Sequence, residues 1–127
     1  MSPTQELLHL TQRLLDCIAR ADWPAYQELC DPTLTAFEPE ALGQLVEGMP
    51  FHQFYFELDG AQGQHHTSLC APHVRLMGDV AVVSYVRLNQ RLRGDGTPYT
   101  TAFDETRVWQ RQDGRWKHVH FHRSPVP

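Results

Sequence analysis

Cysteine is scarce and widely spaced in this sequence. There are three, Cys17, Cys30 and Cys70, and they include no C-x-x-C pair and no spacing typical of a metal site. An odd number of cysteines without such a pair favours reduced thiols, the usual state in the cytoplasm. We therefore expect small core side chains at these positions rather than disulfides.

Long apolar runs and a basic start are missing as well. No stretch approaches the roughly 18 apolar residues that a transmembrane helix needs. Residues 1–9 contain Glu6 but no Lys or Arg, which is unlike the basic start of a signal peptide. The formal net charge of −4 argues against nucleic acid and anionic membranes as main partners. These absences favour a cytoplasmic protein.

The composition is that of a globular domain. The chain has 127 residues, of which 41% are hydrophobic, 20% charged and 10% aromatic. No internal repeat, low-complexity segment or linker divides it. We therefore expect one domain over residues 1–127 with one hydrophobic core.

The first half of the chain carries helical patterns. Apolar residues at three- and four-residue steps predict an amphipathic helix over residues 4–19, with Thr4 as its N-cap. A second helix is predicted from Asp22, with Pro24 in its first turn, and Pro32 ends it. A short strand at 34–37, helices at 41–47 and 51–57, and a loop over 58–64 are predicted to follow.

From residue 65 onward the pattern changes to a period of two. Strands are predicted at 66–77, 80–93, 98–112 and 115–123, separated by glycine-containing turns at 78–79, 94–96 and 113–114. Strands joined by such short turns are antiparallel. Helices followed by this meander predict an α+β fold.

Both faces of the predicted strand at 80–88 are apolar. Val82 and Val86 lie on one face, whereas Val83 and Tyr85 lie on the other. A sheet with one face in water normally alternates apolar with polar residues. Since the helices can cover only one face, we expect a second copy of the chain to cover the other, in a homodimer or higher oligomer.

Several long stretches resemble a known family. They are residues 30–32, 35–43, 45–48, 51–52, 54–57, 76–79, 105–109 and 119–124. Together they resemble the association (hub) domain of calcium/calmodulin-dependent protein kinase II, within the nuclear-transport-factor-2-like superfamily. The resemblance implies a cone-shaped fold, in which N-terminal helices pack on a curved antiparallel sheet around a deep pocket. It also implies dimers that assemble into larger rings.

The kinase part of that family has no counterpart in these residues. The sequence contains no glycine-rich loop, no catalytic-loop motif and no basic amphipathic helix. We therefore expect neither kinase activity nor calmodulin binding, and no cofactor. The expected role is self-assembly combined with the binding of a small ligand.

Three arginines are the strongest candidates for ligand binding. Arg87, Arg107 and Arg123 each share a predicted strand face with large apolar residues. In the resemblance these positions point into the pocket, where His52 and Tyr55 from the aromatic segment meet them. His52 and Tyr55 are then expected to act as neutral hydrogen-bond donors.

Buried guanidinium groups repel one another and are costly unless anions or carbonyl groups satisfy them. A small carboxylate or phosphate ligand would do so through bidentate hydrogen bonds. Internal pairing with Glu57 or Glu105 would do so as well. Both interpretations stay open, and they can hold together if one arginine pairs and two remain free.

Three histidines, His118, His120 and His122, recur at two-residue steps, which places them on one face of a predicted strand. Such a row could bind zinc. However, the residues between them are expected to face the pocket, so the histidines would lie on the outer face, in the subunit interface. We therefore expect no metal there. The expected interface residues are Val82, Val86, His120 and His122.

An enzyme remains the alternative. Relatives in the wider superfamily include isomerases, dehydratases and hydrolases, which use a carboxylate base with a tyrosine or histidine acid. The candidates here are Glu105 or Glu57, with Tyr55 and His52. Nearby arginines would lower the pKa of such a carboxylate and make it a poorer base. An apolar cavity without arginines would favour the enzyme, and a basic cavity would favour the binding domain.

Overall fold

Helices precede most of the sheet along the chain. The computed structural model describes residues 1–58 and 65–127. Its helices are α1 (Pro3–Ala19), α2 (Trp23–Leu29) and α3 (Pro50–Glu57), with a 3-10 turn η1 at Pro39–Ala41. Its strands are β1 (Cys30–Phe37), β2 (Val46–Glu47), β3 (His65–Met77), β4 (Val80–Leu92), β5 (Pro98–Gln112) and β6 (Arg115–Pro125).

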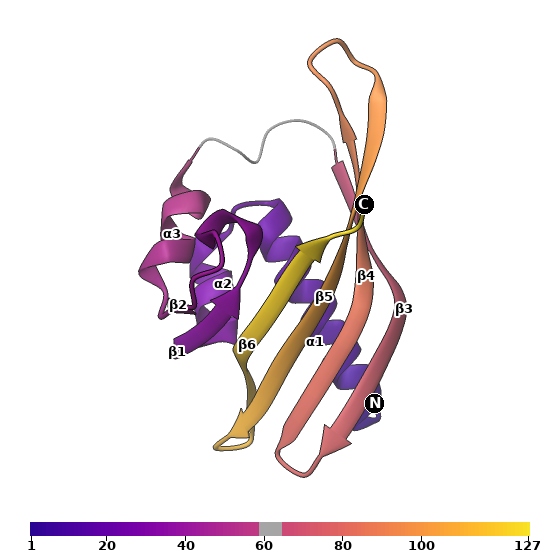
Figure 1. Cartoon of the computed structure of the whole chain (residues 1–127). Coiled ribbons are helices and arrows are strands. Elements are labelled where there is room, and N and C mark those ends of the chain that lie inside the picture. The colour runs from indigo at the N-terminus through magenta and orange to yellow at the C-terminus, as the bar shows by residue number, and fades with distance from the viewer. Residues whose placement is uncertain (59–64) are drawn as a thin grey trace.

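The six strands form one curved sheet in the order β2-β1-β6-β5-β4-β3 (Figure 1). Strands β3 to β6 are a meander of antiparallel neighbours, which confirms the predicted α+β fold. Strand β1 runs parallel to β6. Parallel neighbours need a long connection, and here the chain between β1 and β6 contains α3 and the other strands of the sheet. The sheet is therefore mixed at the end where β1 and β2 join it.

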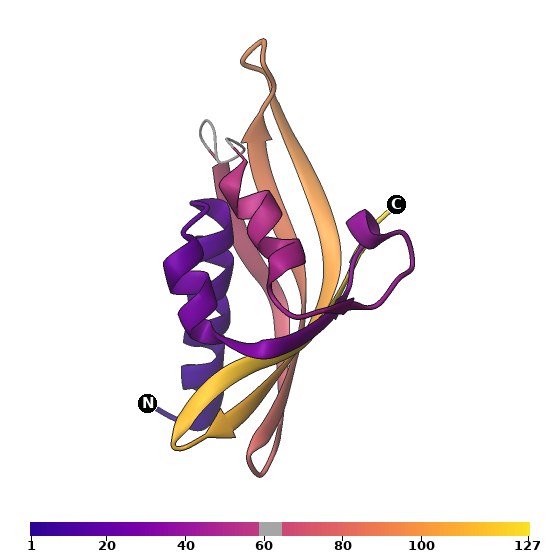
Figure 2. The ribbon, with the colours of Figure 1, turned by 90° about the vertical axis from the view of Figure 1, so that its left-hand side faces the viewer.

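All three helices lie on one side of the sheet (Figure 2). Helix α1 packs against β3 and β4, and its Leu7, Leu14 and Leu15 are fully buried, as the spacing of apolar residues predicts. Its N-cap is Ser2 instead of the predicted Thr4. The Ser2 hydroxyl accepts the backbone N–H of Gln5, and the Gln5 side chain accepts the N–H of Ser2 in return.

The segment after β1 differs from the prediction. The helix expected at 41–47 is wrong, since only the short η1 turn forms, followed by β2 paired with β1. Leu42 and Gly43 both adopt left-handed backbone angles, with φ of 53° and 89°. A left-handed residue ends a right-handed helix, so the chain turns back and forms a strand instead.

The helices leave the outer face of the sheet without a layer of its own. On β4 the inner residues Ala81, Val83 and Tyr85 are buried, whereas Val82 and Val86 on the outer face are only half-buried. Among residues 1–58 and 65–127, no helix covers that outer face (Figure 2).

No described helix has the length and apolar character needed to cross a membrane. Most of the loop predicted at 58–64 lies outside the described residues.

Candidate functional site

Inner-facing residues of the three central strands form a polar patch under the helices. The register places Tyr85 of β4 opposite Glu105 of β5, and Arg107 of β5 opposite Phe121 of β6. Neighbouring positions with a period of two add Arg87 and Arg123 to the same face. Strand pairing thus brings together all three arginines that the sequence predicts as pocket residues.

Glu105 is at the centre of this patch. Its Oε1 atom accepts hydrogen bonds from the Tyr85 hydroxyl at 2.6 Å and from Nη2 of Arg107 at 3.0 Å. Its Oε2 atom accepts one from Nη1 of Arg87 at 3.1 Å. Burial alone would raise the pKa of Glu105, but the guanidinium groups of Arg107 and Arg87 hold it at about 2. Glu105 is therefore a fixed negative charge that joins two arginines.

Arg107 has little capacity left for a ligand. It is 1% exposed, and its Nε donates to the Tyr85 hydroxyl at 2.7 Å while Nη2 donates to Glu105. Its Nη1 lies 3.4 Å from Nε2 of His118, and its guanidinium lies over the ring of Phe121. These contacts satisfy most of its donors, so Arg107 forms a wall of the site.

Arg123 pairs mainly with two other carboxylates, although its Nε also lies 3.9 Å from Oε2 of Glu105. Its Nη1 and Nη2 atoms form a bidentate pair with Glu40 at 2.9 and 2.7 Å, and Nη1 also donates to Glu38 at 3.3 Å. Sequence reasoning offered Glu57 or Glu105 as an internal partner for the arginines, and Glu105 does pair with Arg87 and Arg107. Glu57 lies on the exposed side of α3 instead, where it accepts a hydrogen bond from Gln53.

His52 and Tyr55 reach the site from α3. His52 is 5% exposed, and burial followed by the charge of Arg107 lowers its pKa to about 4, so the imidazole is neutral. Its Nδ1 lies 3.5 Å from Oε1 of Glu38, which favours the tautomer with the proton on Nδ1. Its buried Nε2 has no hydrogen-bond partner among the described residues. Tyr55 is 41% exposed and lies at the opening.

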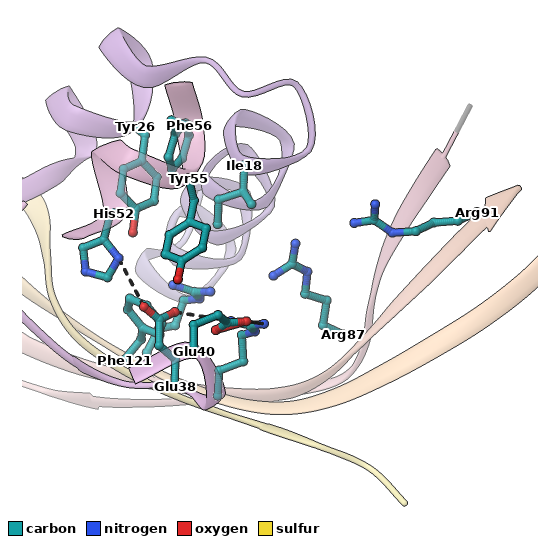
Figure 3. A pocket seen from close by; sticks show the side chains of 12 residues that line it. Ile18, Tyr26, Glu38, Glu40, His52, Tyr55, Phe56, Arg87, Arg91 and Phe121 are labelled. Carbon is teal, nitrogen blue, oxygen red and sulfur yellow. Dashed lines mark hydrogen bonds and ion pairs between the residues drawn. The ribbon is translucent and has the colours of Figure 1, made fainter. Parts of the chain in front are cut away.

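These side chains surround a cavity of about 230 Å³ between the helices and the sheet (Figure 3). Its apolar lining comes from aromatic and aliphatic residues on α1, α2, α3 and β6. Its polar lining includes four arginines. The Nε atom of Arg87 is buried there without a hydrogen-bond partner among the described residues. The lining residues are Ile18, Tyr26, Glu38, Glu40, His52, Tyr55, Phe56, Arg87, Arg91, Arg107, Phe121 and Arg123.

A β-bulge in β6 changes the expected row of histidines. The register pairs Trp109 with His118 but Val108 with His120, so Val119 is an extra residue on β6. His118 therefore points inward and is fully buried, with Nδ1 3.5 Å from Sγ of Cys30. The prediction that all three histidines share the outer face is wrong for His118. His120 and His122 do lie on the outer side, where both rings contact Phe37.

The geometry does not suit the enzyme alternative. Its candidate base, Glu105, is ionised at ordinary pH and bonded to Tyr85, Arg87 and Arg107. A carboxylate with a pKa near 2 is a weak base. Tyr55 and His52 face a cavity lined by arginines instead of an apolar one.

Sequence reasoning missed several residues of the site, among them Glu38, Glu40, Tyr85 and Arg91. Arg91 follows Arg87 by four residues on one strand, so the period of two places both on the same face. That signal was available. Glu38 and Glu40 come from the irregular segment after β1, where no periodicity indicates direction.

Comparison with known proteins identifies the family of the chain. The family described as "Calcium/calmodulin dependent protein kinase II association domain" matches residues 3–127. The rabbit (Oryctolagus cuniculus) calcium/calmodulin-dependent protein kinase type II subunit delta is 52% identical over an alignment of 126 residues, which covers 97% of this chain and 24% of that protein. The chain thus spans about a quarter of the length of that relative.

Solved structures show the same fold. The CaMKII hub homology domain of Chlamydamonas reinhardtii is 45% identical, with a TM-score of 0.94 and complete coverage of both chains. A nuclear transport factor 2-like superfamily protein from Salmonella enterica is 25% identical, with a TM-score of 0.79 over 97% of this chain and 90% of that one. The fold is therefore of the nuclear-transport-factor-2-like type. The chain belongs to the calcium/calmodulin-dependent protein kinase II association domain family.

Proposed function

We propose that this chain is a non-catalytic, self-associating domain, acting in the cytoplasm, whose cavity binds a small carboxylate. The observation that carries the ligand part is Arg87, which lines a cavity of about 230 Å³ and whose buried Nε has no partner among the described residues. A buried, unpaired N–H on a charged group is costly, and a bound anion would satisfy it.

The outer face of the sheet supports the proposal of self-association. Val82 and Val86 of β4 are half-buried there, and His120 and His122 of β6 lie on the same face, with β5 between the two strands. Related association domains are known as hub domains, which is consistent with assembly of several copies. A stable dimer of standard size would bury about 1,600 Å² in total. We propose that a second copy of this chain supplies that cover.

Light scattering of the purified protein tests the self-association. The wild type is expected to give at least twice the mass of 14.6 kDa. Val86→Arg places a charge in the proposed interface and is expected to lower the mass to that of a monomer. Gln27→Arg adds the same charge on the exposed side of α2 and is the matched control. A monomeric wild type would overturn the proposal.

The chemistry of the cavity suggests how a carboxylate is held. Arg107 and Arg123 already pair with carboxylates, so their role in the proposed site is to form its walls. Among the described residues, Arg87 has one hydrogen bond, from Nη1 to Glu105, so its guanidinium group keeps donor capacity for a ligand. Tyr55 at the opening offers a hydroxyl group, and the lining rings offer apolar contact.

A thermal-shift titration tests the ligand proposal. We expect acetate, isobutyrate or benzoate to raise the melting temperature, and the neutral amide benzamide to have a smaller effect. A ligand at a hundredfold excess over its Kd stabilises the folded state by about 2.7 kcal/mol. Arg87→Gln is expected to reduce the shift, whereas Arg115→Gln at the exposed start of β6 is not. If no carboxylate raises the wild-type melting temperature, the pocket is only structural.

A further inference from the structure

A polar hollow lies on the outer face of the sheet, on the side away from the helices. It has a volume of about 310 Å³, and its outward side chains come from three neighbouring strands. The register places Ser84 of β4 beside Thr106 of β5, and Thr106 beside His122 of β6. Asp104 and Ser124 form the next pair on the same face. The hollow is therefore part of the face through which we propose that the chain self-associates.

Asp104 brings a negative charge to this hollow. No nitrogen of a lysine, arginine or histidine side chain in residues 1–58 or 65–127 lies within 4.0 Å of its carboxylate. Asp104 lies directly opposite Val86, so a second copy that covers Val86 also removes water from Asp104. A carboxylate that loses its water without gaining a cation destabilises the covered state. Self-association therefore requires a positive charge beside Asp104.

His122 can supply this charge. Histidine is the side chain whose charge ordinarily changes between about pH 5 and pH 8. Because Asp104 pairs with Ser124, His122 is its diagonal neighbour on the same face, and side chains in that relation are within reach of each other. His120, the preceding histidine on that face, already has Nδ1 2.7 Å from the Thr35 hydroxyl. Burial, followed by the charge of His122, lowers the pKa of His120, so protonation of His120 is disfavoured.

The other side chains around His122 leave this pair to itself. Strand β1 brings Phe37, an uncharged side chain, against the His122 ring. Among the described residues, the other charged or titratable groups near this face are Glu38, Glu40 and Arg123, which pair with one another on the inner side, and Cys70, His73 and Arg75 on β3, the strand beyond β4. Asp104 and His122 are therefore the two groups of the hollow itself whose charges decide whether it can be covered.

We propose that self-association of this chain strengthens on mild acidification, because protonated His122 then compensates the charge of Asp104 in the covered hollow. This inference rests on the proposed self-association, with a second copy of the chain as the cover. At higher pH each copy brings an uncompensated carboxylate to the hollow, which opposes covering. The assembled state therefore binds a proton at His122 more tightly than the separate copies do. Linkage then favours assembly as the pH falls through the range in which histidine titrates, and the gain is lost as the pH rises again.

Sedimentation equilibrium of the whole chain, over a dilution series at about pH 8 and about pH 6, tests the inference. The Kd of the wild-type assembly is expected to fall about tenfold at the lower pH, because a hydrogen bond between charged groups contributes that much or more. His122→Gln keeps a hydrogen-bonding side chain that does not titrate, so its Kd is expected to be equal at both pH values. Where wild type does not dissociate on dilution, Val86→Ala trims the same face and serves as the background for these variants.

Asp104→Asn makes the opposite prediction. Without the carboxylate, the covered hollow needs no cation, so this variant is expected to assemble more tightly than wild type at about pH 8. Protonation of His122 then leaves a positive charge uncompensated, so its assembly is expected to weaken at about pH 6. His9→Gln, on the exposed side of α1, removes a titrating group away from the hollow and is expected to keep the wild-type response. Circular dichroism at both pH values checks that each variant is folded.

The outcomes separate this inference from the proposed self-association. A wild type that is monomeric at both pH values would overturn both. A wild type that assembles equally well at both values would overturn the inference alone, as expected if Arg75 rather than His122 compensates Asp104. A response that persists in His122→Gln and Asp104→Asn would also overturn it, because the effect would then come from the net charge of −4. Tighter assembly of wild type at the lower pH, lost in His122→Gln and reversed in Asp104→Asn, supports it.

Discussion

Nη2 of Arg107 lies 3.0 Å from Oε1 of Glu105, and both side chains are withdrawn from solvent almost completely. Each charged group is therefore desolvated, and its burial is stabilised by the opposite charge of its partner. Removing one partner of a buried pair leaves the second uncompensated, which costs far more than the pair contributes to stability. The Arg107–Glu105 pair joins β4 and β5 through Tyr85 and Arg87, so its loss affects the centre of the sheet.

Glu105→Gln is accordingly expected to destabilise the fold strongly. The neutral amide of glutamine leaves the guanidinium groups of Arg87 and Arg107 without a buried anion. The free energy of unfolding is therefore expected to fall by about 3–5 kcal/mol. Glu40→Gln is the matched control, since Glu40 is much more exposed and its loss is expected to cost about 1 kcal/mol or less. Urea unfolding followed by circular dichroism measures both. Equal losses in the two variants would contradict the central role of Glu105.

The elements that follow a strict period could be predicted from the sequence. Helix α1 and strands β4 and β5 bury one side each, so the spacing of their apolar residues reports the direction of their side chains. The turn signals at Gly78, Gly96 and Gly114 correspond to left-handed glycines between strands. The inward direction of Arg87 and Arg107 follows from the same periodicity.

Features that break the period could not be predicted in this way. The bulge at Val119 reverses the direction of His118 relative to His120, and no residue type at that position signals it. The left-handed Leu42 ends a segment whose composition favours a helix. Glu38 and Glu40 depend on that irregular segment, so the pairing of Arg123 required three-dimensional contacts.

Thiol reactivity is expected to differ among the three cysteines. Cys17 and Cys30 are 1% and 3% exposed. Burial raises the pKa of the Cys17 thiol, and it raises the pKa of the Cys30 thiol to about 12. Cys70 is half-buried on β3, opposite Val86. With Ellman's reagent, we expect at most one thiol to react in the native protein and all three to react after unfolding.

The same reagent reports on the proposed interface. Because Cys70 pairs with Val86 at the outer face, it is expected to react faster in Val86→Arg than in wild type if that variant separates the subunits. Cys70→Ser is the control and is expected to abolish the native reaction. Fast reaction of two or more thiols in the native protein would show that the core opens more readily than its burial suggests.

No stoichiometric zinc is expected at the histidines of β6. His118 is turned into the core beside Cys30, and Nδ1 of His120 is 2.7 Å from the Thr35 hydroxyl. Among the described residues, no cluster of three or more potential ligands could hold a metal ion. Elemental analysis after zinc loading and desalting measures this. Retention of one zinc per chain that is lost in His120→Ala would show the prediction wrong.

Acidification is expected to destabilise the fold in two stages. Burial, with the charge of Arg107, lowers the pKa of His52 from 6.5 to about 4 in the folded state. Between these values the unfolded chain binds a proton that the folded chain does not, so stability falls as the pH drops from about 6.5 to 4. His118, whose pKa burial also lowers, acts in the same direction. Glu105, with its pKa lowered from 4.5 to about 2, adds a further loss below pH 4.5.

His52→Gln separates the first stage from the second. Glutamine does not titrate, so the variant is expected to lose less stability than wild type between pH 6.5 and 4, by at most about 3 kcal/mol for a shift of this size. Below pH 4.5 the two proteins are expected to lose stability in parallel, because Glu105 is unchanged. Urea unfolding at a series of pH values gives both curves. His9→Gln on the exposed side of α1 is the control and is expected to follow wild type throughout. If His52→Gln also follows wild type between pH 6.5 and 4, His52 is not held neutral by its burial, and the acid sensitivity must come from other groups.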